Sequence, residues 1–114
     1  MNIKDLNQFG IDGPNEGKLI IDLFSEWCGP CKLVSPILEN FRNKGLINLI
    51  QIDVVKNREL ARKLNVNAVP TLLFFKDGKL LDKNIKVMGE IMVNKGIMIG
   101  ATGELILKEI ITQI

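Results

Sequence analysis

A strand-like segment, two cysteines and a helix-like segment follow one another directly, and this order constrains the fold more than any other feature. Residues 19–24 form a short, almost wholly apolar run that is typical of a strand buried inside a sheet. After the motif Trp-Cys-Gly-Pro-Cys-Lys at residues 27–32, apolar residues recur three and four positions apart, as on one face of a helix. Cys28 and Cys31 are therefore predicted at the turn where a buried strand becomes a helix.

The predicted position of the two cysteines favours redox chemistry over packing. With two residues between them in such a turn, the cysteines can bring their sulfur atoms close enough to bond. A helix start carries unpaired N–H groups and a partial positive charge, which stabilise a thiolate by about 0.3–1 kcal/mol when exposed and up to about 2 when partly buried. We expect Cys28, nearer the exposed turn, to be the attacking thiol. Cys31, one helical turn further in, is expected to be buried and to resolve the mixed disulfide.

Asp22 is the candidate base for this chemistry. It is an acidic residue in an otherwise apolar strand, six positions before Cys28. Because burial disfavours a carboxylate, we expect the pKa of Asp22 to be raised toward neutrality, where it can take the proton of Cys31. Trp27 offers an apolar surface along which a substrate chain can lie.

Length, composition and charge narrow the remaining functions. The chain has 114 residues, 46% of them apolar, so we expect a single domain over residues 1–114 with one core. The net charge of +2 is spread along the sequence without a basic run, which disfavours nucleic acid and anionic membranes as partners. The first residues contain no apolar stretch of signal-peptide length. We therefore expect a cytoplasmic protein, in a compartment where structural disulfides are rare.

Metal binding is disfavoured by the same inventory of side chains. A structural zinc site takes about four ligands, nearly always Cys or His. The chain has two cysteines and no histidine, so only a site shared between chains could qualify.

The first half of the chain predicts a parallel pair of strands joined by a helix. Leu6 and Phe9 are expected to face the core from a short N-terminal helix, and residues 10–17 to form a loop. Strands are predicted at residues 18–24 and 46–54. The helix between them begins after Pro30, runs to about Lys44 and stops at Gly45. A helix between two such strands implies a right-handed crossover.

The second half predicts a hairpin and a closing helix, so that the whole chain follows the order βαβαββα. A short helix capped by Asn57 precedes a third strand at residues 72–75, and Asp77-Gly78 signals a hairpin. Residues 85–93, interrupted by Gly89, are predicted as an extra hairpin arm. Thr102 is expected to cap a last helix. Its predicted apolar residues are Leu105, Ile106, Ile110, Ile111 and Ile114.

These residues resemble the thioredoxin family. The motif at residues 27–32 is highly specific, and Asp22 falls where the family has a buried aspartate. Pro36 matches its helix-bending proline, and Pro70, in the context Val-Pro-Thr, matches its active-site cis-proline. The Asp-Gly turn and the Gly-Ala step before the last helix also match, so the resemblance covers roughly residues 18–81 and 96–114.

The resemblance implies an α/β thioredoxin fold, with a central mixed sheet flanked by helices, and dithiol–disulfide exchange with protein substrates. It implies no bound cofactor beyond the Cys28–Cys31 pair, and a thioredoxin reductase as electron donor. We expect a monomer that binds neither nucleic acid nor membrane. In the family, the residue before the cis-proline offers backbone hydrogen bonds to an extended substrate. The substrate-binding residues expected from the resemblance are Trp27, Gly29, Pro30, Val69, Pro70 and Gly100.

The chain departs from the family pattern at two places that bear on function. The family often has a lysine near the buried aspartate, and the corresponding residue here is Leu49, which leaves the proton path open. Residues 83–95 form an extended hairpin insert before the last helix, about a dozen residues longer than the family hairpin. The insert contains Met88 and Met92, which are either core residues or a contact surface.

Two other functions remain possible from the sequence. One is a thioredoxin-like binding or assembly module in which the insert docks a partner and the cysteines are incidental. The other is an oxidant or isomerase of an oxidising compartment. The missing signal segment disfavours the latter, and so does the Gly-Pro pair between the cysteines, which goes with a reductant in this family.

Overall fold

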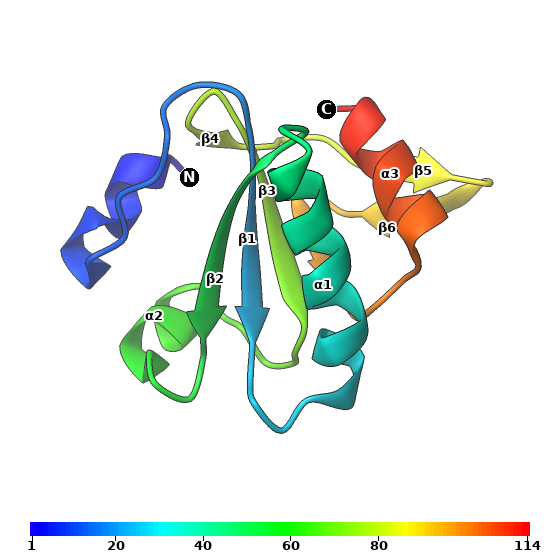
Figure 1. Cartoon of the computed structure of the whole chain (residues 1–114). Coiled ribbons are helices and arrows are strands. Elements are labelled where there is room, and N and C mark those ends of the chain that lie inside the picture. Colours follow the sequence, from blue (N-terminus) through cyan, green and yellow to red (C-terminus); the bar gives the residue numbers. More distant parts are fainter.

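The computed structural model describes residues 1–114 and contains a central mixed sheet between two layers of helix (Figure 1). Strand β1 (Lys18–Phe24) lies in the middle, parallel to β2 (Asn48–Asp53) and antiparallel to β3 (Thr71–Lys76). Two short strands, β4 (Lys79–Leu80) and β7 (Ile97–Ile99), pair antiparallel with successive parts of β3. The predicted fold class is confirmed.

Helices cover both faces of the sheet, which explains why its central strands lack polar alternation. Helices α1 (Gly29–Asn43) and α3 (Glu104–Thr112) lie on one face, and the 3-10 helix η1 (Ile3–Phe9) and α2 (Arg58–Lys63) lie on the other (Figure 1). Alternate side chains of β1 pack into the two helical layers, and Ile20 packs with residues of α1 and α3. No helix combines the length and the hydropathy that a bilayer crossing requires.

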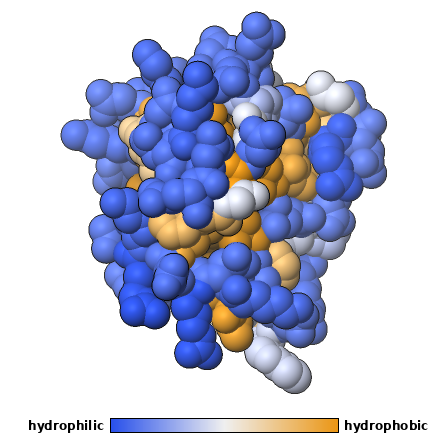
Figure 2. Space-filling model, turned by 90° about the vertical axis from the view of Figure 1, so that its left-hand side faces the viewer, coloured by the Kyte–Doolittle hydropathy of each residue, from blue (hydrophilic) through white to orange (hydrophobic).

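The face with η1 and α2 holds the smaller of the two apolar clusters. Its buried members include Ile3, Leu6 and Leu60, which pack against β1 and β3. Figure 2 shows this side of the molecule, where apolar side chains reach the surface between hydrophilic ones. Partly buried residues of this layer are Phe9, Ile11, Ile50, Val54, Leu64, Val66, Leu80 and Ile97.

Helix α1 begins at Gly29, slightly before the predicted start after Pro30, and ends where the sequence predicts. Cys28 is its N-cap, Pro30 lies in the first turn, and Gly45 follows the last turn with a positive φ of 75°. Proline is tolerated in a first turn because the N–H that it lacks would have no partner there. The helix continues through Pro36 and buries one apolar stripe against the sheet. The buried residues of the stripe are Cys31, Val34, Leu38 and Phe41.

Three details of the predicted helices are wrong. Asn57 occupies the N-cap of α2, but its side chain donates to the carbonyl oxygen of Asp53 and caps nothing. The N-cap of α3 is Gly103 rather than Thr102. Leu105 is 85% exposed, and Leu107, which the pattern missed, is fully buried in its place. Leu107 lies three and four positions before Ile110 and Ile111 and therefore shares their face of α3, whereas Leu105 does not.

The insert forms a hairpin of its own that extends the core beside α3. Its strands are β5 (Ile85–Val87) and β6 (Glu90–Val93), joined by a turn in which Met88 and Gly89 both have positive φ. Met92 is partly buried against the large cluster, which is the apolar core between the sheet and helices α1 and α3. Met88 at the tip is 89% exposed. One methionine of the insert therefore packs against the core, and the other lies in solvent. The three buried apolar residues of the hairpin are Ile85, Val87 and Val93.

Candidate active site

The two cysteines lie at the start of α1, directly after the end of β1, and are joined by a disulfide bond. Their Cα atoms are 5.3 Å apart. The Sγ atom of Cys28, at the N-cap, accepts a hydrogen bond of 3.1 Å from the backbone N–H of Cys31. An N-cap acceptor is the group that an unpaired helix N–H stabilises, and a thiolate is a stronger acceptor than a thiol. The first sulfur is therefore placed where negative charge is favoured.

Exposure differs between the two cysteines in the expected order. Cys28 exposes 8% of its surface and Cys31 exposes 3%. Cys28 is thus less open than the sequence leads one to expect, although its neighbours in the turn are in solvent. Trp27 is 91% exposed, and Gly29 and Pro30 are exposed as well. An attacking partner reaches the disulfide from this side of the turn.

A second loop lies next to the cysteines, at the end of the sheet where β1 ends and β3 begins. Thr71, the first residue of β3, pairs with Leu23 near the end of β1. Because the two strands are antiparallel, the residues before Thr71 lie beside the C-terminal end of β1, where the chain enters the cysteine turn. The Val69–Pro70 peptide bond is cis, which confirms that prediction, and the carbonyl oxygen of Pro70 accepts 2.9 Å from the N–H of Gly100.

Asp22 is fully buried in β1, on the face covered by α1. Its Oδ2 atom accepts 2.6 Å from the hydroxyl of Ser35 on α1 and 3.3 Å from the side-chain amide of Gln51 on β2. Its Oδ1 atom is buried without a partner. Burial raises the pKa of Asp22, the hydrogen bonds from Ser35 and Gln51 lower it, and the charge of Glu39 raises it, with a net shift upward. The expected direction is confirmed, and the physical cause is the one expected.

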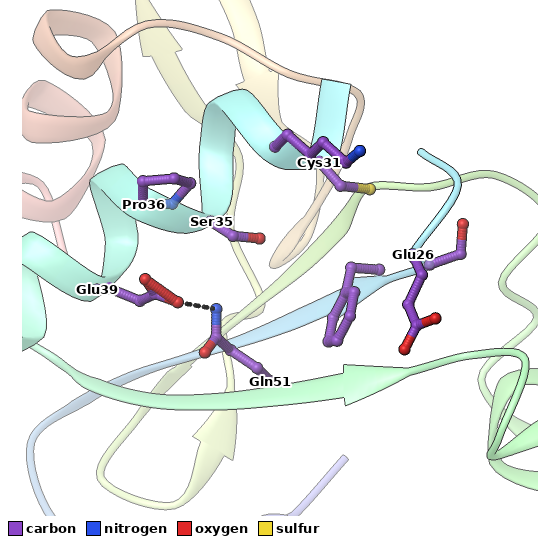
Figure 3. Close-up of a pocket in the computed structure, with 9 residues that line it drawn as sticks. Glu26, Cys31, Ser35, Pro36, Glu39 and Gln51 are labelled. Carbon is purple, nitrogen blue, oxygen red and sulfur yellow. Dashed lines mark hydrogen bonds between the residues drawn. The ribbon is translucent and has the colours of Figure 1, made fainter. Parts of the chain in front are cut away.

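An open pocket of about 420 Å³ connects this polar cluster to solvent. Cys31, Ser35 and Glu39 line one wall from successive turns of α1, and Gln51 faces them from β2 (Figure 3). The amide of Gln51 lies 3.3 Å from Glu39 Oε1 as well as from Asp22 Oδ2, so it bridges the two carboxyl groups. Asp22 does not line the pocket and lies behind Ser35 and Gln51.

Sequence reasoning missed Ser35, Gln51 and Glu39. One signal was available for the helix residues, because Ser35 and Glu39 follow Cys31 at intervals of four and therefore share its face. Gln51 occupies the register position directly beside Asp22 on the parallel strand. Leu49, which corresponds to the family lysine, pairs with Ile20 and packs against the large cluster. The neutral amide of Gln51 therefore provides the β2 contact to the buried acid.

A disulfide at a helix start, next to a buried acid with a raised pKa, is the arrangement of a thiol–disulfide oxidoreductase. The comparisons with known proteins narrow this class. The family model described as Thioredoxin matches residues 6–96. The chain belongs to the thioredoxin family, and Cys28 and Cys31 form its redox-active pair.

Relatives and solved structures agree with this assignment. The thioredoxin of Staphylococcus saprophyticus is 39% identical over 74 residues, which cover 63% of this chain and 71% of that protein. The thioredoxin of Bacillus subtilis is 37% identical over 73 residues, or 62% of this chain and 70% of that one. The structure of Fasciola hepatica thioredoxin superposes with a TM-score of 0.66 at 32% identity, covering 96% of this chain and 88% of that chain. Oxidised mitochondrial thioredoxin 3 of Saccharomyces cerevisiae gives a TM-score of 0.64 at 29% identity, with coverage of 87% and 80%.

Proposed function

We propose that this protein works as a reductant of disulfides in other proteins, with Cys28 as the nucleophile and Cys31 as the resolving thiol. The observation that carries the proposal is the hydrogen bond from the Cys31 N–H to Cys28 Sγ, because it stabilises charge on the first sulfur alone. Cys28 is also the more exposed of the two. In the first step the Cys28 thiolate attacks a substrate disulfide, and a mixed disulfide forms as one substrate sulfur leaves.

Asp22 serves as the base for the second step. Cys31 loses its proton and attacks Cys28 Sγ, so that the Cys28–Cys31 bond forms and the second substrate sulfur leaves as a thiolate. A carboxyl group with a raised pKa is suited to take and return a proton near neutral pH. The protein dithiol loses two electrons and the substrate disulfide gains them, so the step balances without a cofactor.

The substrate binds at the end of the sheet where the cysteine turn follows β1 and the loop with Val69 and Pro70 precedes β3. Trp27 provides an exposed apolar flank, and the backbone of Val69 offers hydrogen bonds to an extended substrate segment. Pro70 and Gly100, joined by a backbone hydrogen bond, form the floor beside it. Gly29 and Pro30 complete the surface next to the sulfurs.

We propose a single domain over residues 1–114 that acts as a monomer in the cytoplasm and is recharged by a thioredoxin reductase. A binding module with incidental cysteines is not favoured, because the pair is bonded and placed at a helix start.

Reduction of insulin by dithiothreitol tests the function. We expect the protein at micromolar concentration to accelerate insulin precipitation strongly, and the Cys28→Ser variant to give only the rate of dithiothreitol alone. A wild-type protein with no effect would support the binding module instead. The reduction potential separates a reductant from an oxidant, since 30 mV corresponds to about a tenfold change in the two-electron equilibrium.

A further inference from the structure

We propose that the hydroxyl of Ser35 relays the proton between Cys31, across the pocket, and the buried carboxyl of Asp22. The inference deepens the proposed function, because it rests on Asp22 as the base. Nothing in the resemblance to the family assigns a role to this serine. The proposed relay rests on the hydrogen bonds to Asp22 and on the residues that line the pocket.

The first observation is that Asp22 has no direct contact with the pocket. Its carboxyl group accepts hydrogen bonds only from Ser35 and Gln51, and both donate to Oδ2. Ser35 and Gln51 line the pocket together with Cys31. A proton that travels from Cys31 to Asp22 must therefore pass one of these two groups.

The second observation distinguishes the two groups by their chemistry. The amide nitrogen of Gln51 donates hydrogen bonds but has no lone pair available to accept a proton. The Ser35 hydroxyl both donates and accepts, so it can receive one proton while passing its own to Asp22 Oδ2. Its 2.6 Å contact is also much shorter than the 3.3 Å contact of Gln51.

The third observation concerns the distance between Ser35 and Cys31. Residues four apart on a helix have Cβ atoms about 5–6 Å apart on the same face, a separation that one water molecule can bridge. Both side chains open into the same pocket (Figure 3). The relay therefore has a geometric path from the thiol to the hydroxyl.

The Cys31 S–H bond breaks, its proton reaches Ser35 Oγ through the pocket, and the original Ser35 proton moves to Asp22 Oδ2. Ser35 ends unchanged, Asp22 becomes a neutral acid, and the Cys31 thiolate attacks Cys28 Sγ. The departing substrate thiolate carries away the electron pair. The proton of Asp22 then leaves through Ser35 and the pocket, and it is taken up by that thiolate or by water.

The charged groups around Asp22 come from few elements. On α1, Glu39 faces it through the Gln51 bridge, and Lys32 lines the pocket mouth. Glu26 also lines the pocket and is paired with Lys56 at 3.4 Å. The β3 residue beside Asp22 is the apolar Leu72, and its β2 neighbour is the neutral Gln51. Glu39 is therefore the charge to which the relay is sensitive.

The experiment follows the oxidation of the reduced protein by insulin between pH 6 and 9, using the fluorescence of the single tryptophan, Trp27. The variants are Ser35→Ala, Ser35→Thr and Glu39→Gln. We expect Ser35→Ala to be at least tenfold slower than wild type at pH 7 and within about twofold at pH 9, where the thiol ionises without a base. Ser35→Thr keeps the hydroxyl and is expected to retain most of the rate.

The pH midpoint of the rate provides a second readout, which reports the hydrogen bond from Ser35 to Asp22 separately from the relay. Loss of the Ser35 donor destabilises the carboxylate and is expected to shift the midpoint upward, whereas loss of the Glu39 charge is expected to shift it downward. A Ser35→Ala profile parallel to wild type at all pH values would overturn the relay while leaving the reductase function intact. Failure of the wild type itself to reduce insulin would overturn the proposed function, and the relay with it.

Discussion

The side-chain amide of Gln113, next to the C-terminal end of α3, donates a hydrogen bond of 3.0 Å to the carbonyl oxygen of Lys86 in β5. In a second hydrogen bond between the insert and Gln113, Lys83 Nζ donates to the carbonyl oxygen of Gln113 at 2.8 Å. The insert is thus fixed to the last helix at two points. Together with its buried apolar residues, these bonds make the hairpin a part of the core rather than an appendage.

Truncation of the insert's core residue should destabilise the protein. We expect Ile85→Ala to lower the free energy of unfolding by about 2–5 kcal/mol, because Ile85 is 1% exposed and its loss leaves a cavity beside α3. Met88→Ala at the exposed tip of the same hairpin is the matched control and should change stability by less than about 0.5 kcal/mol. Urea denaturation measures both. Equal effects of the two variants would show that the hairpin does not pack as described.

The glycine before β7 is needed for a close approach between backbones. Gly96 has φ +83°, its carbonyl oxygen accepts 2.8 Å from Phe74 N–H, and a Cβ there would lie 2.7 Å from the carbonyl oxygen of Leu81. Gly89 has nearly the same φ, +80°, with open space around it. We expect Gly89→Ala to cost about 1–2 kcal/mol for its left-handed conformation. Gly96→Ala should cost about 1–3 kcal/mol more in the same thermal unfolding assay.

The raised pKa of Asp22 makes stability depend on pH. The folded protein holds the Asp22 proton to higher pH than the unfolded chain does, so stability falls as pH rises from the unfolded pKa, about 3.9, through the folded value. Asp22→Asn removes that loss. We expect it to stabilise the protein by roughly 1–3 kcal/mol at pH 8 and by little at pH 3.5. Asp12→Asn, at an exposed acid, is the control and should show no such pH dependence.

Removal of the resolving thiol should arrest the reaction halfway. We expect Cys31→Ser, once reduced, to form a stable mixed disulfide through Cys28 with proteins of a cell extract, which mass spectrometry of the trapped complexes detects. Cys28→Ser should trap far less, because Cys31 is only 3% exposed. Equal trapping by both variants would contradict the assignment of their roles.

Loss of the exposed indole should affect binding without affecting folding. Because Trp27 is 91% exposed, we expect Trp27→Ala to leave the melting temperature nearly unchanged. The KM for a protein substrate should rise about fivefold or more, which corresponds to about 1 kcal/mol of binding free energy. Leu105→Ala, at an 85% exposed residue of α3, is the control. An unchanged KM in Trp27→Ala would remove this residue from the substrate surface.

The sequence alone determined those parts of the protein that local signals specify. An apolar run predicts β1, a proline and a glycine mark the two ends of α1, and residue pairs with positive φ form both hairpin turns. The cysteines fall at the junction because the chain order places them there. The burial and raised pKa of Asp22 followed from its apolar neighbours in the strand.

Only the tertiary structure decided which groups meet around that acid. Ser35 belongs to α1 and Gln51 to β2, and neither periodicity nor composition says that their side chains converge on one oxygen atom of Asp22. Their meeting depends on the register of β2 with β1 and on the rotation of α1 about its axis. The error at α3 is different, because the three- and four-residue spacing of Leu107 from Ile110 and Ile111 already places Leu107 on the buried face and leaves Leu105 in solvent. Side-chain contacts between separate elements are set by packing, which no single segment encodes.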